Sequence, residues 1–226
     1  AQIIGMVALT IILFTGGMDT KFSDIKPILG AGVVLSTLGV LLTTLFTGLF
    51  LYGISHIFPH TIQIPLTMAL LLAATMSSTD SATVFNILRS QKMGLRNKLQ
   101  PLLEFESGSN DPMAYMLTIV MIQVIQGGTN ADLEVWRILL NFVVQFGFGL
   151  IFGYLLGRAC VWIINIINLQ NKSLYPIMML AFIFFIFSFT NLFNGNGYLS
   201  VYVAGIVMGN SKLTENKSIT SFLDGV

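Results

Sequence analysis

Long apolar runs, separated by short polar connectors, dominate the pattern along the chain. Roughly 20 apolar residues suffice for a helix to cross a lipid bilayer. Seven runs are candidate spans, of which the first and the last are short: residues 3–18, 27–54, 64–88, 101–126, 136–167, 174–192 and 198–209. A helix leaves none of its backbone groups unpaired in lipid, so we expect these runs to form helices. The pattern therefore predicts an all-α membrane protein, a polytopic bundle of about seven transmembrane helices.

The composition favours the same environment. The 226 residues are 54% hydrophobic and only 9% charged, whereas a soluble domain carries about 25% charged residues. The formal net charge of +1 gives no reason to expect nucleic acid as a partner, and the predicted partner is the lipid bilayer. The chain starts at Ala1, already inside an apolar run, and ends in a polar stretch. We therefore expect a fragment that is truncated at both ends.

The basic residues sort to one side of the predicted membrane. If the spans alternate in direction, ten of the eleven Lys and Arg residues fall on one face, and Arg137 falls on the other. This is the positive-inside pattern, which places the N-terminus of the chain outside and its C-terminus in the cytoplasm. The ten residues are Lys21, Lys26, Arg89, Lys92, Arg96, Lys98, Arg158, Lys172, Lys212 and Lys217.

Two polar clusters interrupt the apolar runs, and each contains an aspartate. Residues 77–81 read Ser-Ser-Thr-Asp-Ser, and residues 103–112 read Leu-Glu-Phe-Glu-Ser-Gly-Ser-Asn-Asp-Pro. The rise of a helix places Asp111 about 15 Å and Asp80 about 13 Å from the same end of their spans. Both depths are near the middle of a hydrocarbon core about 30 Å thick. Acids at that depth are costly, so they predict a cation or proton site.

Helical spacing assigns the side chains of the second cluster to two faces. Glu104, Ser107 and Asp111 are spaced i, i+3 and i+7, which predicts one face with oxygen ligands for a cation. Glu106 and Asn110 are spaced i and i+4 on the adjacent face, which can brace the helix against a neighbour. For Glu104, simple solvation near the cytoplasmic end is an equally good interpretation.

The first cluster predicts a break in its helix. Ser and Thr side chains bond to nearby backbone groups and compete with helical hydrogen bonds. A broken helix near Asp80 would present bare carbonyl oxygens to an ion, as the broken helices of transporters do. The alternative is that each aspartate is paired with a basic residue, but no Lys or Arg lies at their predicted depth.

These motifs resemble those of the NhaP-like monovalent cation:proton antiporters. Residues 106–111 resemble the E-S-x-x-N-D signature of that family, and residues 78–80 resemble its T-D element on the preceding span. The runs at 103–112 and 195–205 are most similar to the potassium/proton branch. The resemblance covers essentially the whole chain.

The resemblance implies a secondary active transporter that exchanges potassium or sodium for protons by alternating access. It is not an enzyme, and it needs no cofactor besides the transported ions. The family fold has inverted repeats and works as a dimer in a bacterial inner membrane. Residues 1–226 would form a partial transport domain, with the ion site within 64–126 and connecting spans at 136–209.

The resemblance also implies roles for single residues. Asp111 would bind the cation or the proton in competition, and Asn110 would go with electroneutral exchange. Glu106 would form a structural ion pair with an Arg on a later helix outside this chain. Thr79, Asp80 and Ser107 match positions that surround the ion, with the monovalent cation held at Asp111 and Asp80. Thr15 stands where relatives commonly have an acid, which removes one carboxylate from the expected ligand set.

Two other classes of protein remain open. Two aspartates on neighbouring membrane helices also occur in intramembrane aspartyl proteases, where a carboxylate pair shares a proton. Such proteases resemble G-x-G-D at one aspartate, whereas Asp111 follows Gly-Ser-Asn. A cation channel or a non-transporting membrane scaffold is the second alternative, although the chain lacks the Gly-rich signature of a potassium filter.

Overall fold

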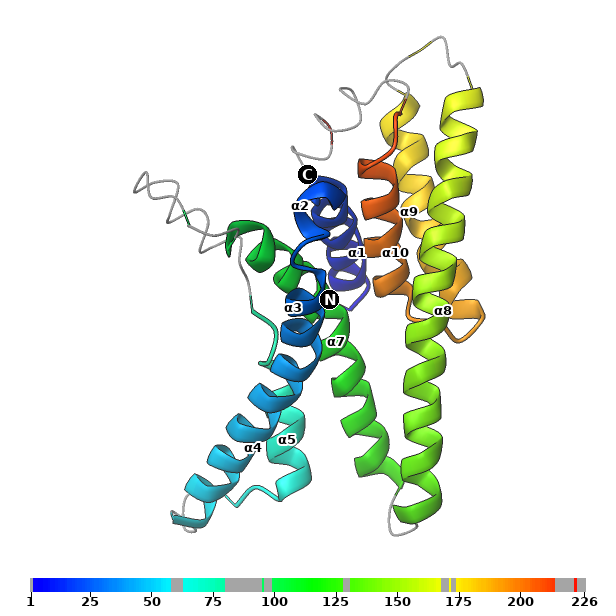
Figure 1. Ribbon diagram of the computed structural model, residues 1–226. Coiled ribbons are helices and arrows are strands. Elements are labelled where there is room, and N and C mark those ends of the chain that lie inside the picture. Colours follow the sequence, from blue (N-terminus) through cyan, green and yellow to red (C-terminus); the bar gives the residue numbers. More distant parts are fainter. Residues whose placement is uncertain are drawn as a thin grey trace. The chain divides into compact units, whose positions relative to one another are not determined.

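The structure, a computed structural model, describes residues 2–57, 63–79, 95, 99–127, 131–167, 171, 174–213 and 222. Every regular element in these residues is a helix (Figure 1), so the prediction of an all-α protein is confirmed. Asp80 lies outside the described residues. So do six of the basic residues on which the predicted orientation depends, namely Arg89, Lys92, Arg96, Lys98, Lys172 and Lys217.

Most helices follow the predicted runs closely, although α5 ends before the third run does, and there are two short additions. One is a single turn between the first two runs, and the other is a π-helical turn inside the second run. The elements are α1 (Gln2–Asp19), α2 (Phe22–Ile25), α3 (Leu29–Val34), η1 (Leu35–Gly39), α4 (Val40–Ile57), α5 (Leu66–Thr75), α7 (Leu99–Gly127), α8 (Ala131–Ile166), α9 (Leu174–Leu192) and α10 (Gly197–Gly209).

Within the described residues, three helical stretches are long and apolar enough to cross a membrane: Leu29–Ile57, Leu140–Ile166 and Leu174–Leu192. Three shorter apolar helices accompany them: Ile3–Asp19, Leu66–Thr75 and Gly197–Gly209. Helix α7 has 29 residues, which is ample length for a span. Its polar cluster makes it less apolar than the other long helices, as expected for a helix that carries a site.

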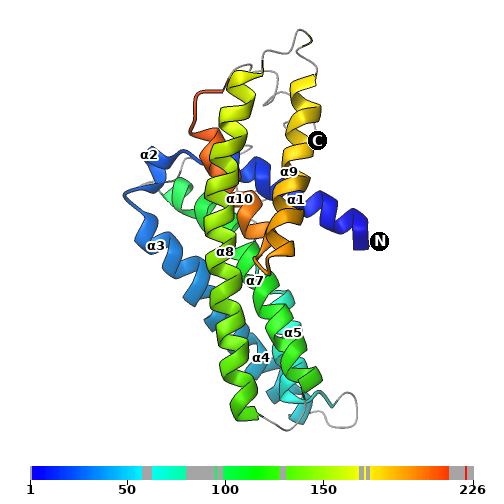
Figure 2. The same cartoon turned by 90° about the vertical axis from the view of Figure 1, so that its right-hand side faces the viewer.

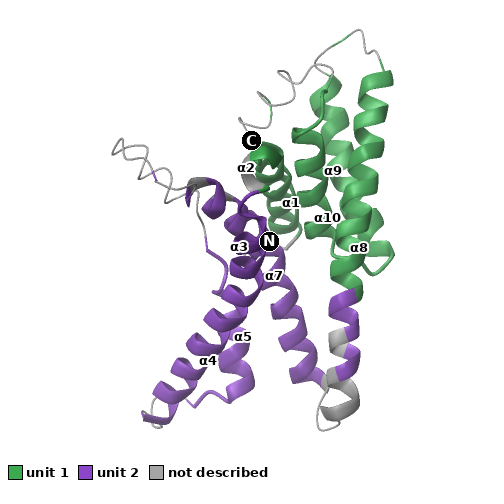
Figure 3. Cartoon of the chain, viewed as in Figure 1, with its two compact units in different colours: residues 1–26, 144–226 green, residues 27–143 purple. Residues whose placement is uncertain are grey.

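The chain divides into two compact units, residues 1–26 with 144–226 and residues 27–143 (Figure 3). The boundary at residue 143 falls inside α8. Each unit has its own packing and is described by itself.

The first unit is built around α1, α9, α10 and the C-terminal part of α8. Figure 2 shows α1 running across α9 and α10 rather than alongside them. Glycines allow the close crossing of α1 and α10, because a Cβ at Gly17 would overlap the carbonyl oxygen of Tyr202. The buried core of this unit draws on all four helices: Phe14, Cys160, Ile164, Tyr175, Met179, Ile183, Ile186, Val201, Ala204 and Met208.

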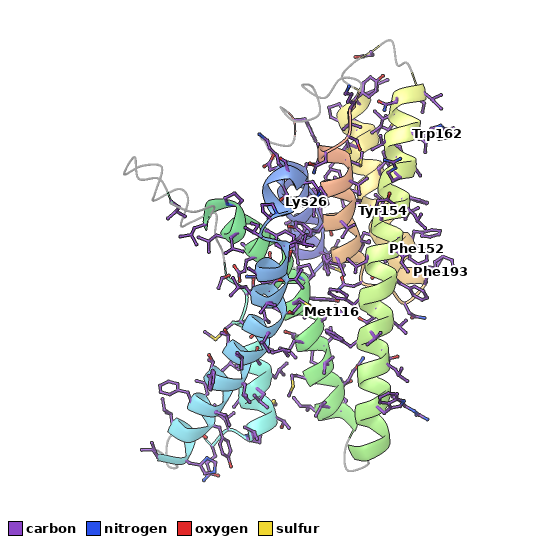
Figure 4. The ribbon with its side chains drawn as sticks, viewed as in Figure 1. Lys26, Met116, Phe152, Tyr154, Trp162 and Phe193 are labelled. Atoms are coloured by element: carbon purple, nitrogen blue, oxygen red, sulfur yellow. The ribbon has the colours of Figure 1, made fainter. Side chains whose placement is uncertain are left out.

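Small residues also bring α8 against α10. Gly149, Gly153 and Gly157 recur every fourth residue and so line one face of α8. A Cβ at Gly153 would lie 2.6 Å from the carbonyl oxygen of Ser200, and the other two glycines are nearly as close to the α10 region. Small residues at this spacing are typical of helix pairs in membranes. Tyr154 and Trp162 of α8 are exposed (Figure 4).

The second unit holds α3, η1, α4, α5 and α7, and it contains both polar clusters. Helices α4 and α5 pack closely at Gly48 of α4. A Cβ added to Gly48 would lie 2.6 Å from the side chain of Leu70 in α5. Helices α3 and α7 pack where the ring of Phe105 fills the space beside Gly32. Helix α5 also packs against α7. The C-terminal end of α5 lies beside the middle of α7 (Figure 1).

Candidate ion-binding site

Helix α5 ends at Thr75, well before the end of the predicted span at residue 88. The hydroxyl of Thr75 donates to Leu72 O (2.7 Å), and that of Ser77 donates to Ala74 O (2.8 Å). These are the local side-chain bonds that compete with helix formation. Residues 77–79 then run without regular structure. The chain thus leaves the helix just before Asp80, as the run of Ser and Thr residues predicts.

Asn110 is the buried centre of the cluster on α7. Its side chain is fully buried, and its Nδ2 donates to Glu106 Oε1 at 3.0 Å, one turn earlier on the same helix. Pro112 lies inside α7, where its missing N–H leaves the carbonyl of Gly108 without the usual helical donor. The middle of α7 therefore offers polar groups to the end of α5.

The hydroxyl of Ser78 bonds to the adjacent residues Asn110 and Asp111 of α7. Ser78 Oγ is within donating distance of two oxygens: Asp111 Oδ1, and Asn110 Oδ1 at 3.2 Å. A hydrogen bond to a charged carboxylate contributes roughly 1.5–3 kcal/mol, more than a bond between neutral groups. Ser78 therefore joins the non-helical segment after α5 to the aspartate that sequence analysis places at the centre of the site.

Thr79 joins the same segment to the other face of α7. Its Oγ1 lies 3.1 and 3.0 Å from the two carboxylate oxygens of Glu106 and accepts a hydrogen bond from Asn110 Nδ2 at 2.6 Å. Among the described residues, the hydrogen-bond donors to Glu106 are thus a hydroxyl and an amide, both neutral. The ion pair with an Arg of a later helix stays a prediction.

The carbonyl of Thr79 differs from the bare carbonyl expected at a broken helix. Its oxygen accepts from Ser107 Oγ (3.0 Å) and from Asn110 Nδ2 (3.3 Å). These bonds form because the backbone oxygen points at the polar face of α7, where donors are available. A cation bound by this carbonyl would have to turn the Ser107 hydroxyl away, which a rotation about one side-chain bond achieves.

The structure brings together Thr79, Glu106, Ser107, Asn110 and Asp111, five of the six residues assigned to the site. The sixth, Asp80, lies outside the described residues. Thr15 belongs to α1 in the other unit, where its hydroxyl donates to Ile11 O at 3.0 Å. It is thus bonded within its own helix.

Ser78 is the site residue that the sequence analysis did not single out. It was one of several Ser and Thr residues in the cluster at 77–81, and a polar pattern does not distinguish among them. The distinction comes from the non-helical backbone, where successive side chains point in different directions. Ser77 bonds back to α5, whereas Ser78 and Thr79 reach α7.

Replacing Asn110 with Ala is expected to destabilise the second unit. The variant removes a fully buried amide together with its hydrogen bonds to Thr79 and Glu106, and a typical hydrogen bond contributes about 0.5–1.5 kcal/mol. Thermal unfolding of the purified full-length protein measures the effect. Thr75→Ala is the control, because its exposed hydroxyl bonds only within α5 and surface changes cost about 0.5 kcal/mol or less. Equal melting temperatures for the two variants would contradict this role of Asn110.

The apolar helices and the family relationship reported below make this an integral membrane protein, and its all-helical structure has the fold of the cation:proton antiporters. The sodium proton antiporter MjNhaP1 from Methanocaldococcus jannaschii has this fold. It superposes with a TM-score of 0.78 over 98% of this chain and 52% of that chain, at 21% sequence identity.

The chain belongs to the sodium/hydrogen exchanger transmembrane family, whose model matches residues 1–226. It is 38% identical to the K(+)/H(+) antiporter NhaP of Alkalimonas amylolytica over 226 residues and 35% identical to the K(+)/H(+) antiporter NhaP2 of Shewanella sp. (strain MR-4) over 228 residues. It is also 26% identical over 209 residues to the low-affinity Na(+)/H(+) antiporter NhaS1 of Synechocystis. The chain spans 38% of the length of the first two relatives.

Proposed function

We propose that the full-length protein exchanges a monovalent cation for protons, and that the two compete for the carboxylate of Asp111. The observation that carries this proposal is the bond from Ser78, at the broken end of α5, to Asp111 in the middle of α7. A carboxylate that lies beside the end of a neighbouring helix can bind a metal ion when charged and a proton when the ion leaves. One group then serves both substrates in turn.

The proposal assigns potassium or sodium to oxygen ligands from both the end of α5 and the middle of α7. Ser107 offers a hydroxyl and Thr79 offers a backbone carbonyl, and these two oxygens already lie 3.0 Å apart. Carbonyl oxygens replace the hydration shell of monovalent cations in membrane proteins. The proposed ligand set is Asp111, Ser107 and the Thr79 carbonyl, with Asp80 as a second carboxylate. Asn110 acts as a neutral brace for Glu106 instead of a second charge, which favours electroneutral exchange.

Potassium is the proposed cation, with sodium as the alternative. The relatives with 33–38% identity are named K(+)/H(+) antiporters, and the named Na(+)/H(+) antiporter has 26% identity. Alternating access, with the site open to one side of the membrane at a time, couples the two ions without direct contact between them.

We also propose the arrangement of the full-length protein in the membrane. The positive-inside pattern favours an outside N-terminus and a cytoplasmic C-terminus for this chain in a bacterial inner membrane. The family resemblance favours a homodimer. Residues 64–126 would carry the ion site, and residues 136–209 would supply connecting spans.

Proteoliposomes that contain the full-length protein test the exchange. With an acidic interior, external potassium should drive protons out, and the signal should persist when the membrane potential is clamped at zero. A potassium current without proton movement would indicate a channel. Cleavage of membrane peptides by the protein would indicate an aspartyl protease. Either result would refute the proposed exchange.

A further inference from the structure

Helix α8 carries a charge inside its apolar stretch. Arg158 lies in the candidate span Leu140–Ile166, eight residues before its end, and its side chain is exposed. No residue in the described part of the chain forms an ion pair or a hydrogen bond with Arg158. A charged side chain within a membrane span is costly, and it normally pairs with another polar or charged group. The guanidinium of Arg158 therefore calls for an anionic partner from its surroundings.

Arg158 faces away from the core of the first unit. The glycine face of α8 packs against α10, where a Cβ at Gly153 would lie 2.6 Å from the carbonyl oxygen of Ser200. Arg158 comes five residues after Gly153, which is about 140° around the helix. Its neighbours on the same side are Leu155 and Trp162, which are 55% and 66% exposed. The partner of Arg158 therefore has to reach it from outside the packed helices of this unit.

The C-terminal end of α8 marks the level at which polar groups replace apolar ones. Asn165 Nδ2 donates to the carbonyl oxygen of Lys212 at 2.9 Å, and Lys212 is exposed just after the end of α10. The helical rise places Arg158 about 10 Å further into the span than Asn165. Because the headgroup region of one leaflet is about 5–7 Å thick, Arg158 starts only slightly inside the hydrocarbon core. From there its long side chain can snorkel to the phosphate layer.

Aromatic rings flank Arg158 one helical turn away in both directions. Tyr154 precedes it by four residues and Trp162 follows it by four, and both rings are exposed (Figure 4). Trp and Tyr are enriched at membrane–water interfaces, because each ring joins an apolar body to a polar edge. Trp162 thus fits the headgroup level, and Tyr154 lies deeper, at the level of the acyl chains. A guanidinium between two such rings favours a partner with an anionic head and an apolar tail.

We propose that this face of α8 binds an anionic phospholipid, such as phosphatidylglycerol, with the lipid phosphate on the guanidinium of Arg158. The planar guanidinium matches two phosphate oxygens in a bidentate pair. Its charge favours a headgroup with a net negative charge, because the ammonium of a zwitterionic lipid competes for the same phosphate. The positive-inside pattern puts Arg158 on the cytoplasmic side, among other basic residues that attract such lipids. This lipid site is independent of the proposed exchange and of Asp111.

Lipid binding by the full-length protein tests this site. The unchanged protein, purified in an uncharged detergent, should unfold at a higher temperature with phosphatidylglycerol than with phosphatidylcholine at the same concentration. Native mass spectrometry measures the bound phosphatidylglycerol. Arg158→Gln should weaken that binding by about fivefold, the effect of one basic residue at a lipid surface. Arg158→Lys keeps the charge without the bidentate geometry and should lose less. Inorganic phosphate in place of the lipid should not stabilise the protein, because it has no acyl chains for the apolar face of α8.

Lys212→Gln is the matched control, because it removes the same charge beyond the end of α10 and leaves the backbone carbonyl that bonds to Asn165 in place. It should keep most of the phosphatidylglycerol binding, and an equal loss in Lys212→Gln and Arg158→Gln would overturn the site in favour of diffuse attraction. Unchanged binding by Arg158→Gln, with lower stability in detergent alone, would overturn it in favour of an acidic side chain of the full-length protein.

Two further results would also overturn the lipid site. One is an unchanged protein that does not prefer phosphatidylglycerol to phosphatidylcholine, and the other is equal stabilisation by inorganic phosphate. If Arg158→Gln does not fold, Trp162→Leu takes its place, since it removes the ring that fits the headgroup level and leaves the charge. Phosphatidylglycerol binding by Trp162→Leu should be weaker than that of the unchanged protein, and equal binding would overturn the inference.

Discussion

The Asp111→Asn variant of the full-length protein is expected to lose potassium-driven proton movement down to the level of protein-free liposomes. An amide can neither release a proton in this pH range nor bind a cation through a charge. Folding should survive, because Asn has nearly the same shape and its carbonyl oxygen can still accept from Ser78, as Asp111 Oδ1 does. The measurement is the collapse of a pH gradient in proteoliposomes on addition of potassium.

Asp19→Asn makes the same chemical change at the end of α1, in the other unit, and serves as the control. It should retain exchange, and both variants should elute as folded protein with melting temperatures close to that of the unchanged protein. Exchange by Asp111→Asn above the protein-free background would contradict the role of Asp111, whatever the rate of the control.

The Gly17→Ala variant is expected to destabilise the first unit, although it adds a single methyl group. The Cβ would overlap the carbonyl oxygen of Tyr202 and crowd the backbone of α10 around Gly205 and Ile206. Backbone atoms cannot rotate away as side chains do, so α1 and α10 must separate. Overpacking of this kind costs about 1–3 kcal/mol.

The neighbouring residue offers a matched control for this packing. A Cβ at Gly16 meets nothing within 4 Å, so Gly16→Ala adds the same atoms to the same helix without a clash. It should be neutral or stabilising by up to about 1 kcal/mol, because Ala favours a helix over Gly. Thermal unfolding in one detergent compares the two variants. If Gly17→Ala is as stable as Gly16→Ala, the close crossing of α1 and α10 is wrong.

The sequence predicted the helices well, because lipid leaves the backbone little choice other than helix. It also predicted the polar faces of α7, since the contact of Glu106 with Asn110 depends only on helical spacing. The break after α5 was predictable because several Ser and Thr residues follow one another there. These features depend on local chemistry, which a single sequence contains.

Other features depend on contacts that local patterns do not encode. Gly17 and Gly205 look like ordinary small residues until α1 and α10 are seen to cross at them. The π-helical turn at Leu35–Gly39 is marked by no proline or charge. Ser78 was missed for the same reason, because its importance depends on the direction of its side chain after the helix ends.

Proton release on cation binding tests the competition at Asp111 without any membrane. Potassium chloride is added to the purified full-length protein in weakly buffered detergent solution, near the pH of half-maximal exchange, with choline chloride as the control salt. Because the bound cation needs the charged carboxylate, the unchanged protein should release up to about one proton for each potassium ion bound, and Asp111→Asn should release none. Potassium binding without proton release, or equal release from Asp111→Asn, would show that the two ions do not share this carboxylate.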